Sequence, residues 1–204
     1  MNDVIVWFSS HYQEILGTVF SLIYLYFSIK QNIWLWPLGL ISSAIYVYIF
    51  LNAGIYADMA LQVYYVVISI YGWYRWSRGA NSEKTGTTDL PVRKTDELTA
   101  GYLLIITSVL FIVISQILLR YTNSQIPYWD AFTTATSITA TWMLAKKYIE
   151  HWLIWFVVDL VSSGLYVYKN LYFTVFLYLV YTAMAIVGYL QWKKTMVNTY
   201  VKQN

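Results

Sequence analysis

The sequence predicts an all-α integral membrane protein with seven transmembrane helices, and three observations lead to this prediction. First, 59% of the 204 residues are apolar and only 11% are charged, whereas about a quarter of the residues in a soluble domain carry charge. Second, the apolar residues form runs close to the ~20 residues that a membrane-spanning helix needs. Third, the chain contains 21 Tyr and 10 Trp, which are the residues that collect at bilayer interfaces. A water-soluble domain is therefore excluded.

Apolar runs separated by polar residues define the predicted spans. We expect helices at 14–29, 34–51, 55–76, 99–120, 129–144, 152–168 and 172–192. Residues 77–98 contain Gly, Pro, Ser, Thr and charges of both signs, which is typical of a loop outside the membrane. The chain is thus predicted to form a single membrane domain over 1–204, with the loop at 77–98 and a polar tail at 193–204.

The basic residues are distributed unequally between the two sides of this arrangement. Loops on the side of the N-terminus carry Arg120 and Lys169, and the opposite side carries the other eleven of the thirteen Lys and Arg. Lys and Arg are retained on the cytoplasmic face of a membrane. The seven-span order therefore predicts an external N-terminus and a cytoplasmic C-terminus.

Two segments in the first half of the chain resemble segments in the second half. SSAIYVY at 42–48 resembles SSGLYVY at 162–168, which lies 120 residues later, and GWYRW at 72–76 resembles GYLQW at 188–192, which lies 116 residues later. The four-residue difference predicts a longer link between the second and third spans than between the sixth and seventh. One interpretation is chance similarity among Tyr-rich helices. The other is a duplicated three-helix bundle, with repeat one at 14–76, repeat two at 129–192 and a linker helix at 99–120 that makes the repeats parallel.

The sixth predicted span carries the clearest group of polar and aromatic residues. At about 100° per residue, its aromatic and polar side chains fall within a sector of roughly 80°. These residues are Trp152, Trp155, Asp159, Ser163 and Tyr166. An ionisable side chain inside a membrane is expensive and needs protein or water around it, and indole faces beside a carboxylate suit a flat cationic ring. The alternative is that both Trp anchor the helix at the interface and Asp159 bonds to a neighbouring helix.

The third predicted span has a similar face, which includes Gln62, Tyr65 and Ser69. Gln62 offers an acceptor and two donors, as a carboxamide or a hydroxylated sugar would require. An ordinary bond between helices explains Gln62 equally well. The hydroxyl-rich fifth span is more typical of close helix packing than of ligand contact.

Several classes of function are excluded or disfavoured by what the sequence lacks. It contains no Cys, and no phosphate-binding glycine loop, zinc motif or Ser/His/Asp arrangement can be placed on it. We therefore expect no catalytic residues, no cofactor and no metal. The net charge of +3 is too small and too scattered to indicate a nucleic-acid partner. His11 and His151 lie near the ends of predicted spans, where an interfacial or solvated position is expected. Passive facilitated transport is the mechanism that needs none of the missing features.

Four motifs in a fixed order resemble the PnuC-type vitamin transporter family. They are Trp-Pro-Leu-Gly at 36–39, Tyr-Ala-Asp-Met-Ala-Leu-Gln at 56–62, Tyr-Gly-Trp-Tyr-Arg-Trp at 71–76, and Trp152-x-x-Trp155-x-x-x-Asp159. The resemblance covers about 14–194. It implies seven helices in a three-plus-one-plus-three arrangement of parallel repeats, similar in plan to the SWEET sugar transporters, in a bacterial inner membrane. It also implies a homo-oligomer, a trimer in this family, and facilitated diffusion followed by phosphorylation of the vitamin by a cytoplasmic kinase.

The same resemblance assigns candidate substrate-binding residues. The family motif Trp-x-x-Trp-x-x-x-Asn falls on Trp152, Trp155 and Asp159, and a substrate-contacting Gln falls on Gln62; the faces described above add Tyr65 and Tyr166. Asp159 replaces the usual Asn, and because a carboxylate only accepts hydrogen bonds, the change favours cations and hydroxyl donors.

These residues lead to one primary function and two alternatives. The primary hypothesis is uptake of nicotinamide riboside, which is a cation with hydroxyl groups. Thiamine or riboflavin transport by a member of the same family is the first alternative. The second alternative comes from another class: a non-transporting membrane scaffold or subunit, whose polar faces serve only helix contacts.

Overall fold

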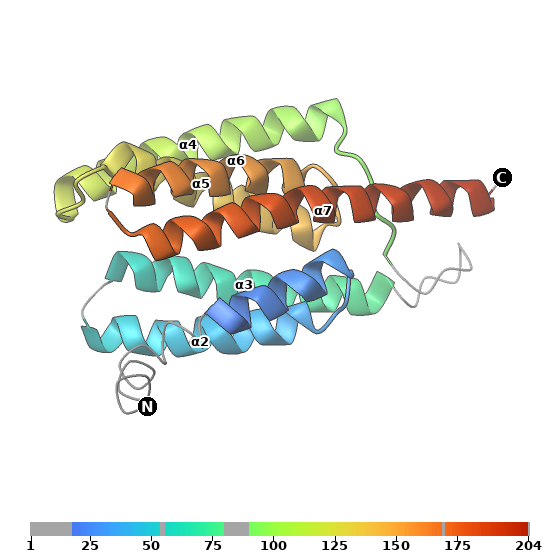
Figure 1. Ribbon diagram of the computed structural model, residues 1–204, viewed down its shortest axis with the longest axis horizontal. Coiled ribbons are helices and arrows are strands. Elements are labelled where there is room, and N and C mark those ends of the chain that lie inside the picture. The colour runs from blue at the N-terminus through green and yellow to red at the C-terminus, as the bar shows by residue number, and fades with distance from the viewer. Residues whose placement is uncertain (1–17, 54–55, 80–89, 169, 204) are drawn as a thin grey trace.

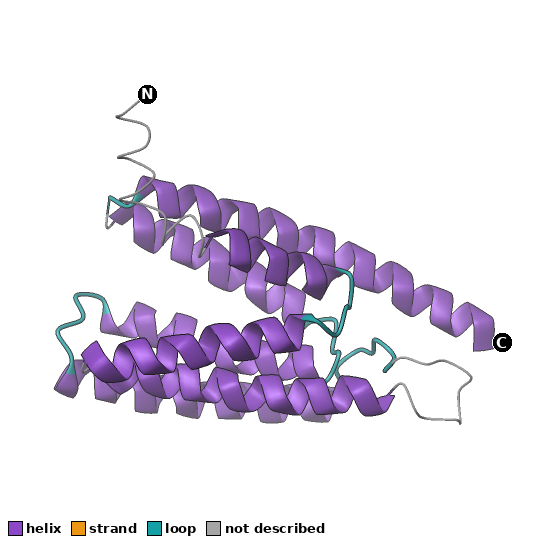
Figure 2. Ribbon diagram, turned by 90° about the horizontal axis from the view of Figure 1, so that it is seen from below, coloured by secondary structure: helices purple, strands orange, loops and turns teal. Residues whose placement is uncertain are grey.

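The computed structural model describes residues 18–53, 56–79, 90–168 and 170–203, and all the regular elements in this part of the chain are helices (Figure 2). An N-terminal helix is described over Thr18–Ile29. It is followed by α2 (Leu35–Ala53), α3 (Tyr56–Gly79), α4 (Glu97–Tyr121), α5 (Pro127–Ala145), α6 (His151–Tyr168) and α7 (Tyr172–Gln203). The expected all-helical fold with seven helices is therefore confirmed. The predicted beginning of the first helix at residue 14 lies outside the described residues.

Helix length and composition agree with a multi-pass membrane protein. In the described part of the chain, α2, α4, α6 and α7 are long and apolar enough to cross a bilayer. The predicted polar tail at 193–204 is continuous with α7, which remains helical to Gln203 and extends past the other helices (Figure 1). Trp192 therefore marks no helix end, because Lys193 and Lys194 are strong helix formers and no Gly or Pro follows them.

The helices form two groups that lie side by side (Figure 1). The N-terminal helix lies with α2 and α3, and α4 to α7 form the other group. Within the groups, α2 packs on α3, α6 packs on α7 and α5 packs on both α4 and α6; the groups meet where α3 packs against α5. Helix α4 buries Ser115 and leaves most of its large apolar side chains exposed, as a helix that faces lipid does.

A constant offset of 116 residues relates the two halves of the chain. α2 begins at Leu35 and α6 at His151, and α3 begins at Tyr56 and α7 at Tyr172. The offset of 120 expected for the second and sixth helices is therefore wrong. The expected longer link between the second and third helices falls on residues 54–55, which lie outside the described residues. The similar tyrosine motifs at 42–48 and 162–168 are thus one helical turn out of register.

Four tryptophans at equivalent positions form a cluster, called here the tryptophan cluster: Trp36, Trp76, Trp152 and Trp192. In each half the two rings meet edge to face, with centroids 5.4 Å apart for Trp36 and Trp76 and 5.9 Å apart for Trp152 and Trp192. Glycine permits this packing, because a Cβ at Gly72 would lie 2.4 Å from the Trp36 ring and one at Gly188 would lie 2.6 Å from the Trp152 ring. The same helix contact is thus built twice.

The tryptophan cluster joins the two halves. The indole N–H of Trp76 donates to the carbonyl oxygen of Ala145 at 3.3 Å, and that of Trp192 donates to the carbonyl oxygen of Ser28 at 3.1 Å. The ammonium of Lys147 lies 4.4 Å from the centroid of the Trp76 ring. Each bond crosses from one half to the other, so these contacts close the bundle at this end.

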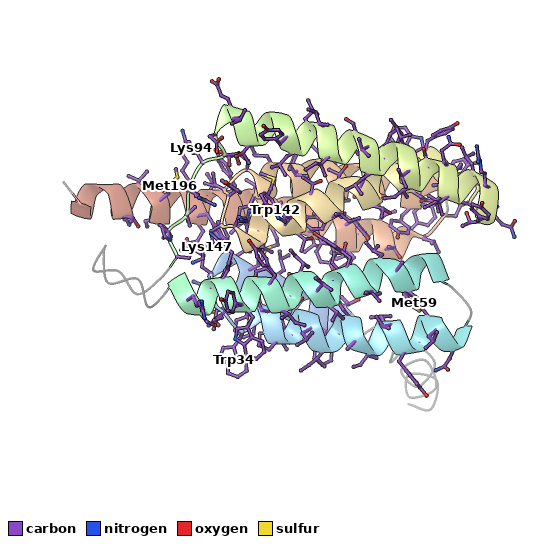
Figure 3. The ribbon with its side chains drawn as sticks, turned by 180° about the vertical axis from the view of Figure 1, so that it is seen from behind. Trp34, Met59, Lys94, Trp142, Lys147 and Met196 are labelled. Atoms are coloured by element: carbon purple, nitrogen blue, oxygen red, sulfur yellow. The ribbon has the colours of Figure 1, made fainter. Side chains whose placement is uncertain are left out.

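The end of the bundle that holds the tryptophan cluster is called here the Lys147 end. Figure 3 shows Lys94, Lys147 and Met196 at this end and Met59 near the opposite one. His151 lies here too, fully buried between the rings of Trp152 and Trp192 at centroid distances of 4.6 and 4.7 Å. The expected interfacial position of His151 is therefore wrong, because the α5–α6 turn folds into the cluster instead of projecting from it.

The last residues of the predicted loop at 77–98 dock onto the Lys147 end. The N–H of Arg93 donates to the carbonyl of Lys147 and the N–H of Ile149 donates to the carbonyl of Arg93. Thr95 donates from both its N–H and its hydroxyl to the carboxylate of Glu150. Asp96 then caps α4, and the bond from the backbone N–H of Thr99 lowers the pKa of Asp96.

Candidate functional site

A cavity of about 400 Å³ lies between the two halves of the bundle, a size typical of a small-molecule site. Its walls come from the N-terminal helix, α3, α5, α6 and α7. The polar and aromatic residues that line it are Ser21, Tyr24, Ser28, Tyr65, Asp130, Thr133, Thr134, Ser137, Trp152, Trp155, Asp159, Ser162, Tyr166, Tyr178 and Tyr181. The cavity is therefore aromatic and rich in hydroxyl groups.

Five of the six substrate-binding residues predicted from sequence line this cavity: Trp152, Trp155, Asp159, Tyr166 and Tyr65. Gln62 is not among the lining residues. The cavity side of α3 is centred on Leu61 and Tyr65, and Gln62 is rotated about 60° from Tyr65 at ~100° per residue. The amphipathic face of α3 is broader than the part that reaches the cavity.

The two tryptophans of the α6 motif have different surroundings. Trp152 is 2% exposed, belongs to the tryptophan cluster and forms the floor of the cavity at the Lys147 end. Its ring already packs against His151, Trp192 and the backbone of Gly188. Trp155, one turn further along, is half-buried and lines the cavity without belonging to the cluster. Trp155 is therefore the indole available to stack on a ligand.

Asp159 lies near the middle of α6 and is 6% exposed. Its carboxylate accepts no hydrogen bond from another described residue, and the Ser163 hydroxyl instead donates to the Asp159 backbone carbonyl. The hydroxyls of Tyr178 and Tyr181 lie close enough to interact electrostatically with the carboxylate. A buried carboxylate without such a bond is costly, so its position on the cavity wall indicates a ligand contact.

Tyrosines of α6 and α7 surround this carboxylate. The Tyr166 and Tyr178 rings are 5.0 Å apart at 34°, and the Tyr178 and Tyr181 rings are 5.6 Å apart at 68°. Tyr181 also shares a hydrogen bond with Ser21 of the N-terminal helix. This bond connects the two halves of the bundle at the level of the cavity, above the tryptophan cluster.

Sequence reasoning missed the residues that the N-terminal helix and α7 contribute. Ser21, Tyr24 and Ser28 recur at helical spacing, and so do Tyr178 and Tyr181. The 116-residue offset between the two halves identifies part of this set, because it places Ser21 at the position equivalent to Ser137 and Tyr65 at the position equivalent to Tyr181. The hydroxyl-rich surface of α5 is more typical of helix packing, yet Thr133 and Thr134 line the cavity.

The charges on the cavity wall have one sign. Asp130 and Asp159 both line it, and among the residues that the structure describes no Lys, Arg or His does. No group of three or more His, Asp or Glu suited to a metal ion occurs in the described ranges. The site thus combines a free indole, several phenols and two carboxylates, which suits a cationic aromatic molecule and repels an anion.

Comparisons with known proteins identify the family. The family model described as nicotinamide mononucleotide transporter matches residues 11–194. The nicotinamide riboside transporter PnuC of Escherichia coli (strain K12) is 25% identical over 200 residues, covering 88% of this chain and 84% of that protein. The riboflavin/roseoflavin transporter RibM of Streptomyces davaonensis is 25% identical over 194 residues, covering 94% of this chain and 90% of that protein.

A solved structure shares the fold. The crystal structure of the vitamin B3 transporter PnuC matches with a TM-score of 0.73 at 22% identity, covering 97% of this chain and 87% of that chain. Since the family model spans nearly the whole chain and the helices superpose over almost all of it, the protein belongs to the nicotinamide mononucleotide transporter family, whose members are membrane transporters and not enzymes.

Proposed function

We propose that this chain carries nicotinamide riboside across the membrane by facilitated diffusion. The observation that carries the proposal is the cavity between the two halves, with Trp155 on its wall, Asp159 near the middle of α6 and no described basic residue in its lining. The similarity to nicotinamide riboside transporters supports the same substrate.

The chemistry of the ligand fits these groups. The pyridinium ring would stack on Trp155, and Asp159 would attract its positive charge and accept from the ribose hydroxyls. Tyr65 and Tyr166 would complete the aromatic wall. Transport needs no ATP in this scheme, because the substrate moves down its own gradient.

The phosphorylated form of the same molecule should not bind. A phosphomonoester carries about −1.5 to −2 charges at neutral pH. The cavity lining contains Asp130 and Asp159 and, among the described residues, no Lys, Arg or His that could bind a phosphate. A cytoplasmic kinase would therefore trap the vitamin after entry. Coupling to such a kinase, and assembly as a homo-oligomer such as a trimer, are part of this proposal.

The orientation follows from charge. With eleven of thirteen Lys and Arg on one side, the Lys147 end and the C-terminus would face the cytoplasm and the N-terminus the outside of the bacterial inner membrane. The tryptophan cluster would then close the cytoplasmic side of the cavity.

Calorimetric titration of the purified protein tests the substrate. We expect binding of nicotinamide riboside, weaker or no binding of riboflavin, and no binding of nicotinamide mononucleotide. Thiamine, also a cationic aromatic molecule, serves as the competing ligand. Failure to bind nicotinamide riboside while thiamine or riboflavin binds would overturn the assignment within the family.

Liposome uptake tests the mechanism. Labelled nicotinamide riboside should equilibrate across the membrane without ATP or an ion gradient and should not accumulate above the external concentration. The absence of uptake by protein that binds the ligand would favour the scaffold or subunit alternative.

Riboflavin is the second candidate substrate, because the similarity to RibM covers 94% of this chain. Riboflavin is uncharged at neutral pH, so its binding should not depend on the charge of Asp159. Competition between riboflavin and nicotinamide riboside in the uptake assay separates the two candidates.

A further inference from the structure

Helix α5 presents a polar stripe to the cavity that the proposed function leaves unused. Asp130, Thr133, Thr134 and Ser137 all line the cavity. Their spacing of three, four and seven residues places them on one side of the helix. The stripe begins with a carboxylate in the first turn of α5 and continues with hydroxyl groups toward the interior of the bundle.

The two carboxylates of the cavity lie at different depths. Asp130 is three residues from the start of α5, and Asp159 is nine residues from the end of α6. The start of α5 and the end of α6 lie at the same end of the bundle, because Ile126 and Trp129 share a second depression with Leu165 and Tyr168. At 1.5 Å per residue, Asp130 lies about 9 Å nearer to that end than Asp159 does. Asp130 is thus at the part of the cavity furthest from the tryptophan cluster.

The Asp130 side chain is held in place by the turn before α5. The Ser124 hydroxyl donates to its carboxylate at 2.5 Å, and the N–H of Ile126 donates to the Ser124 hydroxyl oxygen at 3.2 Å. A carboxylate in the first turn of a helix is also favoured by the helix dipole. These contacts fix a negative charge on the cavity wall.

Asp159 supplies the second observation that points to a ligand. It is more than nine-tenths buried, lines the same cavity, and its carboxylate accepts no hydrogen bond from a described residue. A cation that reaches Asp159 from the end away from the tryptophan cluster passes the α5 stripe first. The hydroxyls of Thr133 and Thr134 can replace water around such a ligand on the way, and Ser137 lies at about the depth of Asp159.

We infer that Asp130 is a charge-selecting residue at the outer part of the cavity, which attracts the cationic substrate and passes it along the α5 stripe to Asp159. This inference rests on the proposed function and adds a specificity-determining residue to it. Asp130 acts on the rate of entry and on the choice between charged and uncharged ligands, whereas Asp159 holds the bound ligand.

A pair of ligands that differ only in charge tests the inference. Nicotinamide riboside is a cation, and its reduced dihydro form has nearly the same shape without the charge. In proteoliposomes, Asp130→Asn should lower kcat/KM for the cation by about three- to tenfold at low ionic strength. The loss should shrink in high salt, because ions screen charges near solvent. Uptake of the dihydro form should change less than twofold.

Two variants at the same place separate charge from structure. Ser124→Ala removes the hydrogen bond but keeps the carboxylate, so it should leave the preference for the cation unchanged. Asp130→Glu keeps the charge and should restore most of the rate. Asp96→Asn removes an exposed acid at the opposite end of the bundle and should have no effect on the ratio of the two ligands.

The outcomes distinguish this inference from the proposed function. Equal losses for both ligands in Asp130→Asn, or the same loss in Ser124→Ala, would overturn the charge-selecting role while leaving the transporter assignment intact. Failure of the wild-type protein to take up nicotinamide riboside at all would overturn the proposed function itself.

Discussion

Trp155 and Trp152 lie one turn apart on α6, yet only one of them is free to meet a ligand. The ring of Trp152 is enclosed by His151, Trp192 and Gly188, whereas Trp155 lines the cavity outside the tryptophan cluster. Removing Trp152 should therefore damage the packing of the protein, and removing Trp155 should damage ligand binding.

Trp155→Ala should weaken binding of nicotinamide riboside by about 1–2 kcal/mol, which is roughly five- to thirtyfold in Kd, because stacking and cation–π contact are lost. Trp155→Phe keeps a ring and should lose less. Calorimetric titration measures both effects. Trp34→Ala removes an exposed indole outside the cavity and is the matched control. Wild-type affinity in Trp155→Ala would contradict the stacking role.

Asp159→Asn should reduce the preference for a charged ligand without abolishing transport, because the amide keeps the size of the side chain and removes its charge. We expect the ratio of the affinities for nicotinamide riboside and its uncharged dihydro form to fall by about fivefold. Unlike the effect of Asp130→Asn, this change should persist in high salt, since Asp159 is buried. Equal changes for both ligands would argue against a charge contact.

At the level of elements, the same helix contact occurs in each half of the molecule. α3 approaches α2 at Gly72 and Trp36, and α7 approaches α6 at Gly188 and Trp152. In both pairs a glycine lets the helix backbone lie against an indole ring, in the way that small residues permit close approach in membranes. The equivalence covers the pairs α2–α3 and α6–α7, and the arrangement of two parallel three-helix repeats with α4 between them stays a prediction.

Gly188→Ala should destabilise the protein by about 1–3 kcal/mol, the usual cost of overpacking, because the new Cβ would lie 2.6 Å from the Trp152 ring. Gly72→Ala should act similarly in the other half. Gly101→Ala on α4 is the control, since a Cβ there meets nothing within 4 Å and alanine favours a helix over glycine. Thermal unfolding in detergent measures the three variants. Equal stability of Gly188→Ala and Gly101→Ala would contradict the observed packing.

For the whole molecule, the two ends of the bundle differ. The Lys147 end contains the tryptophan cluster, its cross-links between the two halves and the docked residues 90–96. At the level of the cavity, the Ser21–Tyr181 bond joins the N-terminal helix to α7. A transporter that opens to the two sides in turn must break these two sets of contacts at different times.

The orientation of the molecule can be tested with single cysteines, because the natural chain contains none. Asn123→Cys places a thiol in the exposed α4–α5 turn, and Lys94→Cys places one at the Lys147 end. In intact cells a membrane-impermeant maleimide should label the first variant and not the second. Labelling of Lys94→Cys should appear only after permeabilisation. The reverse pattern would mean that the Lys147 end faces outward.

Some residues of the cavity can be predicted from the sequence and others cannot. Trp155, Asp159 and Tyr166 were found because they share one helix and one face, and a helical period can be read from sequence. Tyr24 and Tyr178 were missed because their positions on the cavity wall depend on which sides of the N-terminal helix and α7 turn inward. Gln62 was expected at the site because its helix face is polar, but a rotation of about 60° takes it off the cavity wall.

Local composition alone determined the membrane fold, most helix boundaries to within a few residues and the motif on α6, because hydrophobic length and period are properties of a single segment. The end of α7, at Gln203 instead of 192, is the exception. The tertiary structure decided which faces meet. The helices are offset by 116 residues between the two halves, and their packing buries His151 among tryptophans and places Trp152 in the tryptophan cluster. The same packing brings Asp130 to the same cavity as Asp159. The physical reason is that the rotation and depth of each helix are set by the side chains of the helices that pack against it, which lie far away in the sequence.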